Sequence, residues 1–189
     1  MNLLKNSSGN VAVSRPQMNF TRVWPKDLSY RDLVGMNFTG AKLEERDFKG
    51  VNLSKADLAC ADMRNSSFRW AKLNHAKMIG ANLVDADFRE AQLNEAQLSS
   101  ANLVRADLEK ADLIGANLSM AKLTLANLKE ANLWRADLSG ANLWGADLGG
   151  AILLSCQQLQ SAMINRETVL PDYICIRWFS EDRFECTRL

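Results

Sequence analysis

Histidine is almost absent from this chain of 189 residues, in which His75 is the single example. No cysteine or carboxylate stands near His75 at the spacing that metal sites use. The sequence also lacks a glycine-rich phosphate loop and a nucleophile elbow. Its adjacent carboxylates, Glu44 and Glu45, are expected to be exposed. We therefore predict that the protein is not an enzyme, takes no small-molecule substrate, and has no catalytic, cofactor-binding or metal site.

Long apolar runs and an excess of charge are missing as well. No run approaches the about 18 apolar residues of a membrane-spanning helix. The segment Met1–Ser8 lacks the apolar centre of a signal peptide, so we predict a cytoplasmic protein without a membrane segment. The net charge is +1, from 23 Lys and Arg against 22 Asp and Glu. Because cations and anions are interleaved, the direct binding of nucleic acid is not expected.

What the chain has instead is a strict period of five residues. From Leu28 to Leu153 every fifth residue is Leu, Phe or Met, which makes 26 positions. Two residues before each of them the chain usually has Ala, and between the two lies a polar residue, most often Asp or Asn. The period fits neither a helix, nor a coiled coil, nor an alternating strand. It predicts short extended sides, each ending in a corner, with the bulky residue and the Ala both pointing inward.

Four such sides would close one coil, and stacked coils would pair in the manner of a parallel sheet. Residues four repeats apart then share a column, as Phe48, Phe68 and Phe88 do. A column of equal rings avoids voids. The recurrent Asp and Asn are explained by hydrogen bonds from their side chains to nearby main chain.

Units such as Ala101-Asn102-Leu103-Val104-Arg105 resemble the repeat of the pentapeptide repeat proteins. The resemblance implies an all-β solenoid, a right-handed quadrilateral β-helix of about six coils. We predict this solenoid over residues 26–153, an N-terminal tail and cap over 1–25, and a C-terminal cap over 154–189. The first two coils are expected to be distorted, because larger side chains hold the small inward position there: Lys26, Arg31, Met36, Arg46 and Val51.

Both ends of such a stack need covers. Trp24 is expected to lie over the first coil, and Ser155 is a candidate cap for a helical segment after the last one. The aromatic tail that follows could form a hairpin turning at Ser180–Glu181, which would place Cys175 opposite Cys186. A disulfide between these two cysteines is then possible, although reduced cysteines are the preferred interpretation in the cytoplasm.

The outer sides of the predicted rod differ in charge. We call one the smooth side, because small or uncharged residues follow its inward residues Phe38, Leu58, Met78, Leu98, Leu118 and Leu138. We call another the charged side, because Lys, Arg and Glu crowd the positions after Leu28, Phe48, Phe68, Phe88, Leu108, Leu128 and Leu148. Mixed charge of this kind is most simply a solubility device.

Outward apolar residues gather toward the C-terminal end of the repeats. One predicted column holds Ile114, Trp134 and Leu154, and another ends in Trp144. Two interpretations stay open for the tryptophans, namely contact with a partner and cover by the C-terminal segment. The candidate protein-contact residues are Ile79, Ser99, Ser119, Met120, Ser139, Ile114, Trp134 and Trp144.

The function predicted from these features is a non-enzymatic scaffold or regulatory adaptor that presents flat faces to an unknown protein partner. The family resemblance implies an alternative, in which the rod mimics DNA and binds type II topoisomerases such as gyrase. Mimicry needs a dense acidic surface, which this balanced sequence does not provide. The protein is expected to be a monomer or an end-to-end homodimer.

Overall fold

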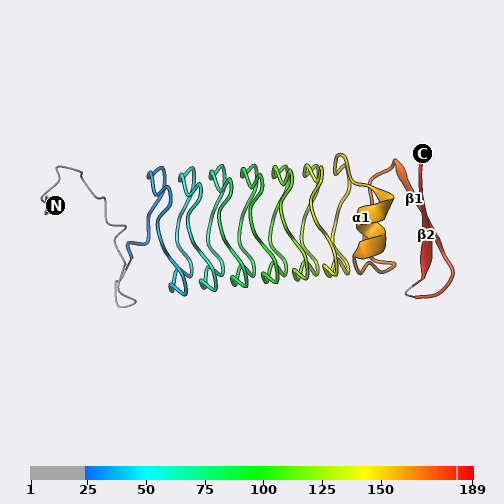
Figure 1. Ribbon diagram of the computed structural model, residues 1–189, viewed down its shortest axis with the longest axis horizontal. Helices are drawn as coiled ribbons and strands as arrows, with labels where there is room; N and C mark the ends of the chain where they lie inside the picture. Colours follow the sequence, from blue (N-terminus) through cyan, green and yellow to red (C-terminus); the bar gives the residue numbers. More distant parts are fainter. Residues whose placement is uncertain (1–23, 182) are drawn as a thin grey trace, which may run out of the picture.

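The computed structural model describes residues 24–181 and 183–189 and shows a rod of stacked coils (Figure 1). A short helix, α1 (Cys156–Ser161), and a hairpin of two strands, β1 (Ile174–Trp178) and β2 (Phe184–Arg188), follow the regular coils at the C-terminal end. The tail and cap predicted over residues 1–25 lie outside the described residues, except for Trp24 and Pro25. Trp24 packs on Phe38 at the first coil, as expected, with ring centroids 4.8 Å apart.

Isolated parallel bridges join neighbouring coils. Nearly every bridge joins the polar residues that precede the inward bulky ones, as Lys72 with Gln92, and the next bridge follows one repeat later. From the first bridge, Asp27 with Asp47, through Asn132 with Ile152, all partners lie four repeats apart. The coil of four repeats predicted from the sequence is therefore confirmed, and the described chain is a β-solenoid. Because a turn ends every repeat, each coil has four sides.

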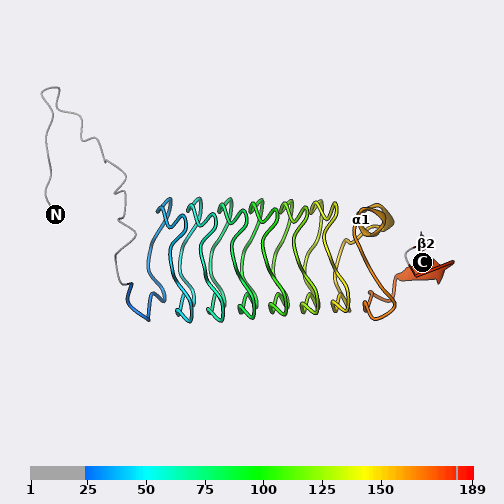
Figure 2. The same ribbon diagram turned by 90° about the horizontal axis from the view of Figure 1, so that it is seen from below.

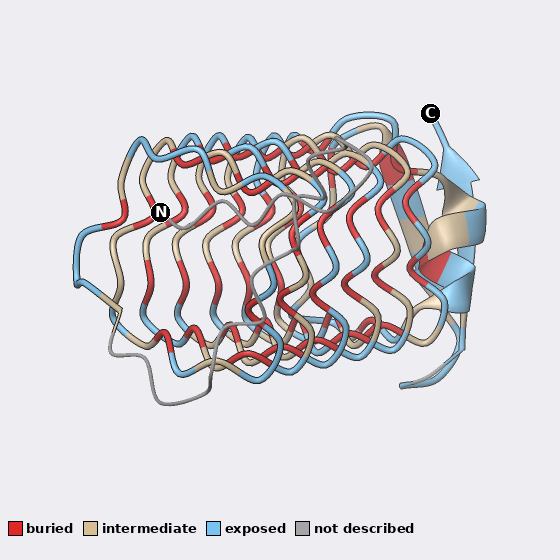
Figure 3. Cartoon of the chain, turned by 60° about the vertical axis from the view of Figure 1, so that its left-hand side comes forward, coloured by how far each residue is buried: buried red, intermediate tan, exposed pale blue. Residues whose placement is uncertain are grey.

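The inward columns fill the interior of the rod. Leu73 and Ala71, which point inward from one side, have no exposed surface, and nearly all equivalent residues are buried in the same way. Phe48, Phe68 and Phe88 form the predicted column, with successive ring centroids 4.8 and 4.7 Å apart and planes 4° and 6° from parallel. Figure 3 shows buried residues on the sides and exposed ones at the corners, so the outer surface consists of corners and polar residues.

A turn ends each side of a coil, and its third residue has a positive φ. In the turn after Leu73, the Ala76 N–H donates to the Leu73 carbonyl at 3.0 Å, and His75 has a φ of 58°. This is the type II pattern. The polar residue before the bulky one supports the next turn, as where the Asp137 carboxylate accepts the Ser139 N–H at 3.0 Å. The predicted role of the recurrent Asp and Asn side chains is confirmed.

Gly35 is a corner residue at which the free-energy cost of a positive φ can be measured without a steric clash. Its φ is +65°, and a Cβ added there would meet nothing within 4 Å. We expect Gly35→Ala to lower the free energy of unfolding by about 1 kcal/mol, because only the left-handed backbone is penalised. Ser100, with a φ of 57°, is the matched control, since Ser100→Ala adds no such penalty and should change stability by less than about 0.5 kcal/mol. Urea denaturation checks both variants, and equal losses would contradict this explanation.

The first coils are more regular than predicted. Lys26 and Arg31 turn outward into solvent, yet their carbonyls still accept hydrogen bonds at 2.8 Å from the next coil. At Arg46 the N–H donates to the Ser66 hydroxyl at 3.1 Å, and that hydroxyl donates to the Leu43 carbonyl at 2.8 Å. The expected distortion is wrong for the main-chain pairing, because the carbonyls of Lys26, Arg31 and Arg46 all keep their hydrogen bonds to the next coil.

The last inward residue of the repeats is Leu154, and the prediction of Leu153 in this role is wrong. Leu154 has no exposed surface, whereas Leu153 is half exposed and has a φ of 59°. The Tyr173 hydroxyl accepts the Leu154 N–H at 3.0 Å and donates to the Ala151 carbonyl at 2.7 Å. The tail therefore binds main-chain groups that another regular coil would have bound. The predicted outward column of Ile114, Trp134 and Leu154 is wrong for its last member.

Helix α1, Cys156–Ser161, takes the place of one side in the last coil. The Ser155 hydroxyl accepts the Gln158 N–H at 3.3 Å, and the Gln158 side chain accepts the Ser155 N–H at 2.9 Å. The Gln158 amide also donates to the carbonyls of Leu133 and Ala136 at 2.8 and 2.9 Å. One glutamine thus caps the helix and satisfies carbonyls of the preceding coil.

After α1 the chain adds two further bridges to the ladder. Met163 pairs with Asn142 and Val169 with Asp147, so the partners are slightly further apart in the sequence than the four repeats of a regular coil. Between these bridges, the Thr168 hydroxyl donates to a carbonyl of the preceding coil at 2.9 Å. This irregular coil covers the edge of the regular one, so that the last parallel ladder does not end in unpaired groups.

Strands β1, Ile174–Trp178, and β2, Phe184–Arg188, form an antiparallel hairpin at the end of the rod (Figure 2). The predicted hairpin is confirmed, but its turn at Ser180–Glu181 is wrong. A longer loop joins the strands, and the Phe179 N–H donates to the Arg183 carbonyl at 2.8 Å across it.

The longer loop changes the disulfide. Cys186 pairs with Ile176 and Cys175 with Thr187, one residue away from the predicted register. Because a shift of one residue moves a side chain to the other face of a strand, Cys186 is turned toward α1. It forms a disulfide with Cys156, with Cα atoms 5.5 Å apart, while Cys175 is exposed and free. The predicted Cys175–Cys186 bond is wrong, and so is the preferred expectation that all these cysteines are reduced.

Candidate protein-interaction surface

Serines follow one another in successive coils of the smooth side, at Ser99, Ser119 and Ser139. Ser119 donates both its N–H, at 3.0 Å, and its hydroxyl, at 2.7 Å, to the side-chain oxygen of Asn117. Hydrogen bonding by Ser139 holds the pKa of Asp137 below its usual value. Because these polar groups are bound locally, the exposed surface of this side is nearly neutral.

Large apolar side chains stand at the corners beside the smooth side. Ile79 is exposed, and Met120 is 64% exposed. Met120 lies over the next coil where Gly140 leaves room, since a Cβ at Gly140 would come within 2.5 Å of the Met120 sulfur. Leu125, at a corner beside the charged side, is also exposed and lies in the same way over Gly145. Leu125 was not among the contact residues predicted from the sequence. The pattern of a large apolar corner residue with a glycine one coil later could have identified it.

The charged side neutralises itself through ion pairs. Arg69 pairs with Glu90 at 3.2 Å, and Arg89 pairs with Asp87 at 2.6 Å and with Asp107 at 3.4 Å. Burial raises the pKa of Asp87, but hydrogen bonds from Arg89 outweigh burial and hold that pKa below its usual value. This side therefore presents alternating charges that are already paired.

Stability should depend on pH through this pairing. Because the pKa of Asp87 is lower in the folded protein, its ionisation stabilises the fold above about pH 4, and this contribution is lost as the pH falls through the folded-state pKa. We expect Asp87→Asn, which keeps a side-chain oxygen, to lose less stability in acid than the parent protein, by up to about 1 kcal/mol. Urea denaturation at neutral pH and at about pH 3 measures both declines. Equal declines would contradict the role of Asp87.

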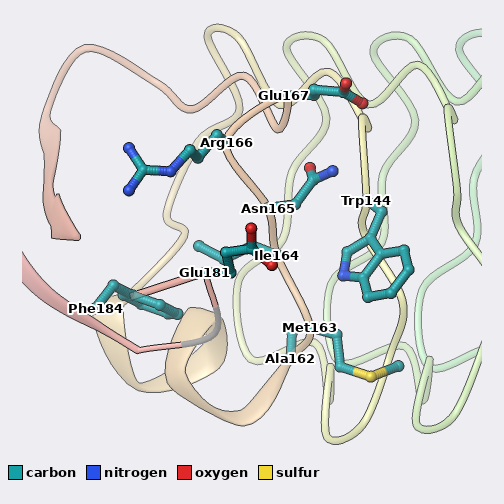
Figure 4. A pocket seen from close by; sticks show the side chains of 9 residues that line it. All are labelled: Trp144, Ala162, Met163, Ile164, Asn165, Arg166, Glu167, Glu181 and Phe184. Carbon is teal, nitrogen blue, oxygen red and sulfur yellow. The ribbon is translucent and has the colours of Figure 1, made fainter. Parts of the chain in front are cut away.

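Trp134 and Trp144 project from opposite sides of the rod, because they are two repeats, and therefore two sides, apart. Trp134 is 45% exposed and borders a hollow of about 420 Å³ shared with α1. Trp144 is 49% exposed and borders a pocket of about 540 Å³ shared with residues 162–167 and Phe184 (Figure 4). The C-terminal segment lies beside each ring and leaves about half of it exposed. Ile114, one coil before Trp134, is half-buried.

Over residues 24–181 and 183–189, no group of three or more His, Cys, Asp or Glu side chains is placed to hold a metal ion. His75 stands at a corner with its Nδ1 3.3 Å from the Glu95 carboxylate, and both side chains are exposed. Within the same described residues, no helix is long and apolar enough to cross a membrane.

A family profile described as pentapeptide repeats, in 8 copies, matches residues 32–69, 66–103, 91–129 and 126–153. The matched segments together cover more than half of the chain. A comparison with curated proteins finds no match.

Several solved structures are similar to the chain. A trypsin-treated form of QnrB1, described as a plasmid-mediated fluoroquinolone resistance protein, has a TM-score of 0.68 at 20% identity, over 77% of this chain and 75% of that one. Rfr23, a pentapeptide repeat protein from the cyanobacterium Cyanothece 51142, has a TM-score of 0.47 at 24% identity, over 77% and 91%. A pentapeptide repeat protein from the thylakoid lumen of Arabidopsis thaliana has a TM-score of 0.43 at 27% identity, over 69% and 74%. Because so few residues are identical, the likeness to QnrB1 shows the fold alone.

Proposed function

This chain belongs to the pentapeptide repeat family, and we propose that it is a non-enzymatic scaffold or regulatory adaptor that binds a protein partner on its outer sides. The inward columns fill the interior, so binding falls to the outer surface. The observation that carries the proposal is a set of exposed apolar side chains toward the C-terminal end. Surfaces of this composition are typical of protein contacts. The set is Met120, Leu125, Trp134, Trp144 and Met163.

In this proposal the partner uses the smooth side together with Trp134 at its edge, and Trp144, on the opposite side of the rod, makes a separate contact. The contact residues are Ile79, Ser99, Ser119, Met120, Ser139, Ile114, Trp134 and Trp144. The rod is proposed to be a right-handed quadrilateral β-helix of about six coils. Its repeats cover residues 26–153, with caps over 1–25 and 154–189, and it acts as a monomer or an end-to-end homodimer.

Charge placed on the smooth side tests the proposal. The triple variant Ser99→Glu, Ser119→Glu and Ser139→Glu should fold but lose the partner in affinity capture from the native cell extract, because carboxylates would be buried at the contact. The matched control, Lys49→Gln, Lys110→Gln and Lys129→Gln, changes the net charge by the same amount on the charged side and should keep the partner. Capture of the same proteins by both variants would contradict this use of the smooth side.

The alternative is a DNA mimic that binds a type II topoisomerase such as gyrase. Its support is the likeness in fold to QnrB1, a fluoroquinolone resistance protein. Against it, phosphate mimicry needs a one-signed acidic surface, whereas Arg69, Arg89 and Lys129 lie among the acids of the charged side. We expect no effect of the protein on gyrase supercoiling, with or without a fluoroquinolone. Inhibition or protection would favour the alternative.

The disulfide gives the proposed cytoplasmic location its own test. Bonds such as Cys156–Cys186 persist chiefly in oxidising compartments. Rapid alkylation of the protein in freshly lysed cells counts its free thiols. Two alkylated cysteines, Cys60 and Cys175, would match the disulfide of the structure and support an oxidising compartment. Four would mean that the disulfide does not form in the cell and would support the cytoplasm.

A further inference from the structure

Trp144 differs from the other tryptophans in the part of the chain that the structure describes. Each of the other four rings packs against an aromatic ring or a guanidinium of this chain. Among the described residues, the ring of Trp144 has neither, and the side chain is half exposed. An indole face carries negative electrostatic potential and attracts cations. Trp144 therefore presents on the outer surface an indole ring that no cation of the described residues contacts.

The exposed indole ring of Trp70, in contrast, contacts a cation of this chain. The Arg69 guanidinium carbon lies 4.7 Å from the centroid of the Trp70 ring. The same guanidinium pairs with the Glu90 carboxylate at 3.2 Å. An arginine held between an aromatic face and a carboxylate combines a cation–π contact with a charge-assisted hydrogen bond.

The pocket beside Trp144 supplies the same two groups without the cation. Glu167 and Glu181 line it together with the rings of Trp144 and Phe184. In Figure 4 Glu181 projects between the two rings. Neither carboxylate has a hydrogen bond or an ion pair with the described residues. The pocket therefore carries two unpaired negative charges next to an unpaired aromatic face.

The arginine that lines this pocket is directed elsewhere. The Arg166 guanidinium lies over the Trp178 ring, 5.7 Å from its centroid. Figure 4 shows its side chain extending away from Trp144. Arg166 therefore reduces the net negative charge of the pocket by one unit, but its side chain does not fill the space beside the Trp144 ring.

We propose that this pocket binds an arginine side chain of a partner protein. A guanidinium is planar, so it stacks on Trp144 and can still donate paired hydrogen bonds to Glu181 or Glu167. A pocket of about 540 Å³ is within the size range that accepts a small ligand or one large side chain. This assignment rests on the proposed scaffold function and names the chemistry of the partner.

A titration followed by NMR tests the assignment. The probe is N-acetyl-arginine methylamide, and the signal is the indole N–H of Trp144, assigned with the variant Trp144→Phe. We expect the arginine probe to shift this signal in a saturable manner, and the uncharged citrulline analogue to leave it in place. Glu181→Gln should weaken binding about 5-fold by removing one charge-assisted hydrogen bond. Trp134→Phe is the matched control and should leave the titration unchanged, because Arg135 already covers that ring.

Three results would overturn the assignment. They are no saturable shift with the arginine probe, equal shifts with arginine and citrulline, and equal affinity for the lysine analogue, which lacks the planar guanidinium. Failure of the titration is separate from failure of the scaffold function. If arginine does not bind but the serine-to-glutamate variant still loses its partner, the pocket is wrong and the scaffold stands.

Discussion

Phe68→Ala is expected to lower the free energy of unfolding by about 3–5 kcal/mol. Phe68 has no exposed surface and stacks between Phe48 and Phe88, with centroids 4.8 and 4.7 Å away. The ladder hydrogen bonds fix the spacing of the coils, so the neighbours cannot close the cavity that the ring leaves. Urea unfolding followed by circular dichroism measures the loss.

Phe68→Leu is the control for this prediction. Leu is the commonest inward residue of the repeats and fills most of the space, so its cost should be about 1 kcal/mol. If the Ala and Leu variants lost the same amount, the stability of the rod would not depend on filling the column. That result would contradict the account of the interior.

Loss of the Cys156–Cys186 disulfide is expected to cost about 3–4 kcal/mol, measured as the effect of Cys186→Ser on urea unfolding. The bond closes a loop with a sequence separation of 30 residues and ties β2 to α1. Its removal frees the unfolded chain from that constraint. It also releases the strand that carries Phe184, one wall of the pocket beside Trp144.

The free cysteine of the same hairpin provides the control. Cys175 is exposed and unpaired, so Cys175→Ser should change the free energy of unfolding by less than about 0.5 kcal/mol. A reducing agent should destabilise the parent protein and the Cys175→Ser variant alike, and leave Cys186→Ser unchanged. Insensitivity of the parent protein to reduction would contradict the disulfide.

The repeats were predictable because the forces that shape them are local and recur. The spacing of Ala71 and Leu73 sets which residues point inward, and the Asp or Asn between such pairs binds the adjacent main chain. A column such as Phe48, Phe68 and Phe88 then follows from the number of sides in a coil. No contact beyond the next coil is needed for any of these inferences.

The C-terminal end was less predictable because its contacts join residues that lie outside the five-residue period. Leu154 takes the inward position in place of Leu153, and its N–H donates to Tyr173, 19 residues later. The disulfide partner of Cys186 depends on the length of a hairpin loop, and one extra residue in the register turns Cys186 away from Cys175. Neither the loop length nor the Tyr173 contact has a signal in the sequence.

The candidate surface was predictable in part for the same reason. The columns of Ser99, Ser119 and Ser139 and the exposed Trp134 follow from the repeat. The pocket beside Trp144 does not, because Glu181 and Phe184 reach it from the hairpin. These two residues are more than 30 positions from Trp144 in the sequence, and no repeat relates them to it.

The surfaces assigned to a partner exist only if every four repeats advance the chain by one strand spacing. A distance measured by electron paramagnetic resonance between spin labels at Thr39→Cys and Ser139→Cys, with Cys60 and Cys175 replaced by Ser, tests this directly. The two sites lie in one column, five coils apart. We expect a single narrow distribution of label-to-label distances at about 24 Å, which is five steps of the parallel-strand spacing. A broad distribution, or one centred well beyond that distance, would contradict the stacking of the coils and every surface derived from it.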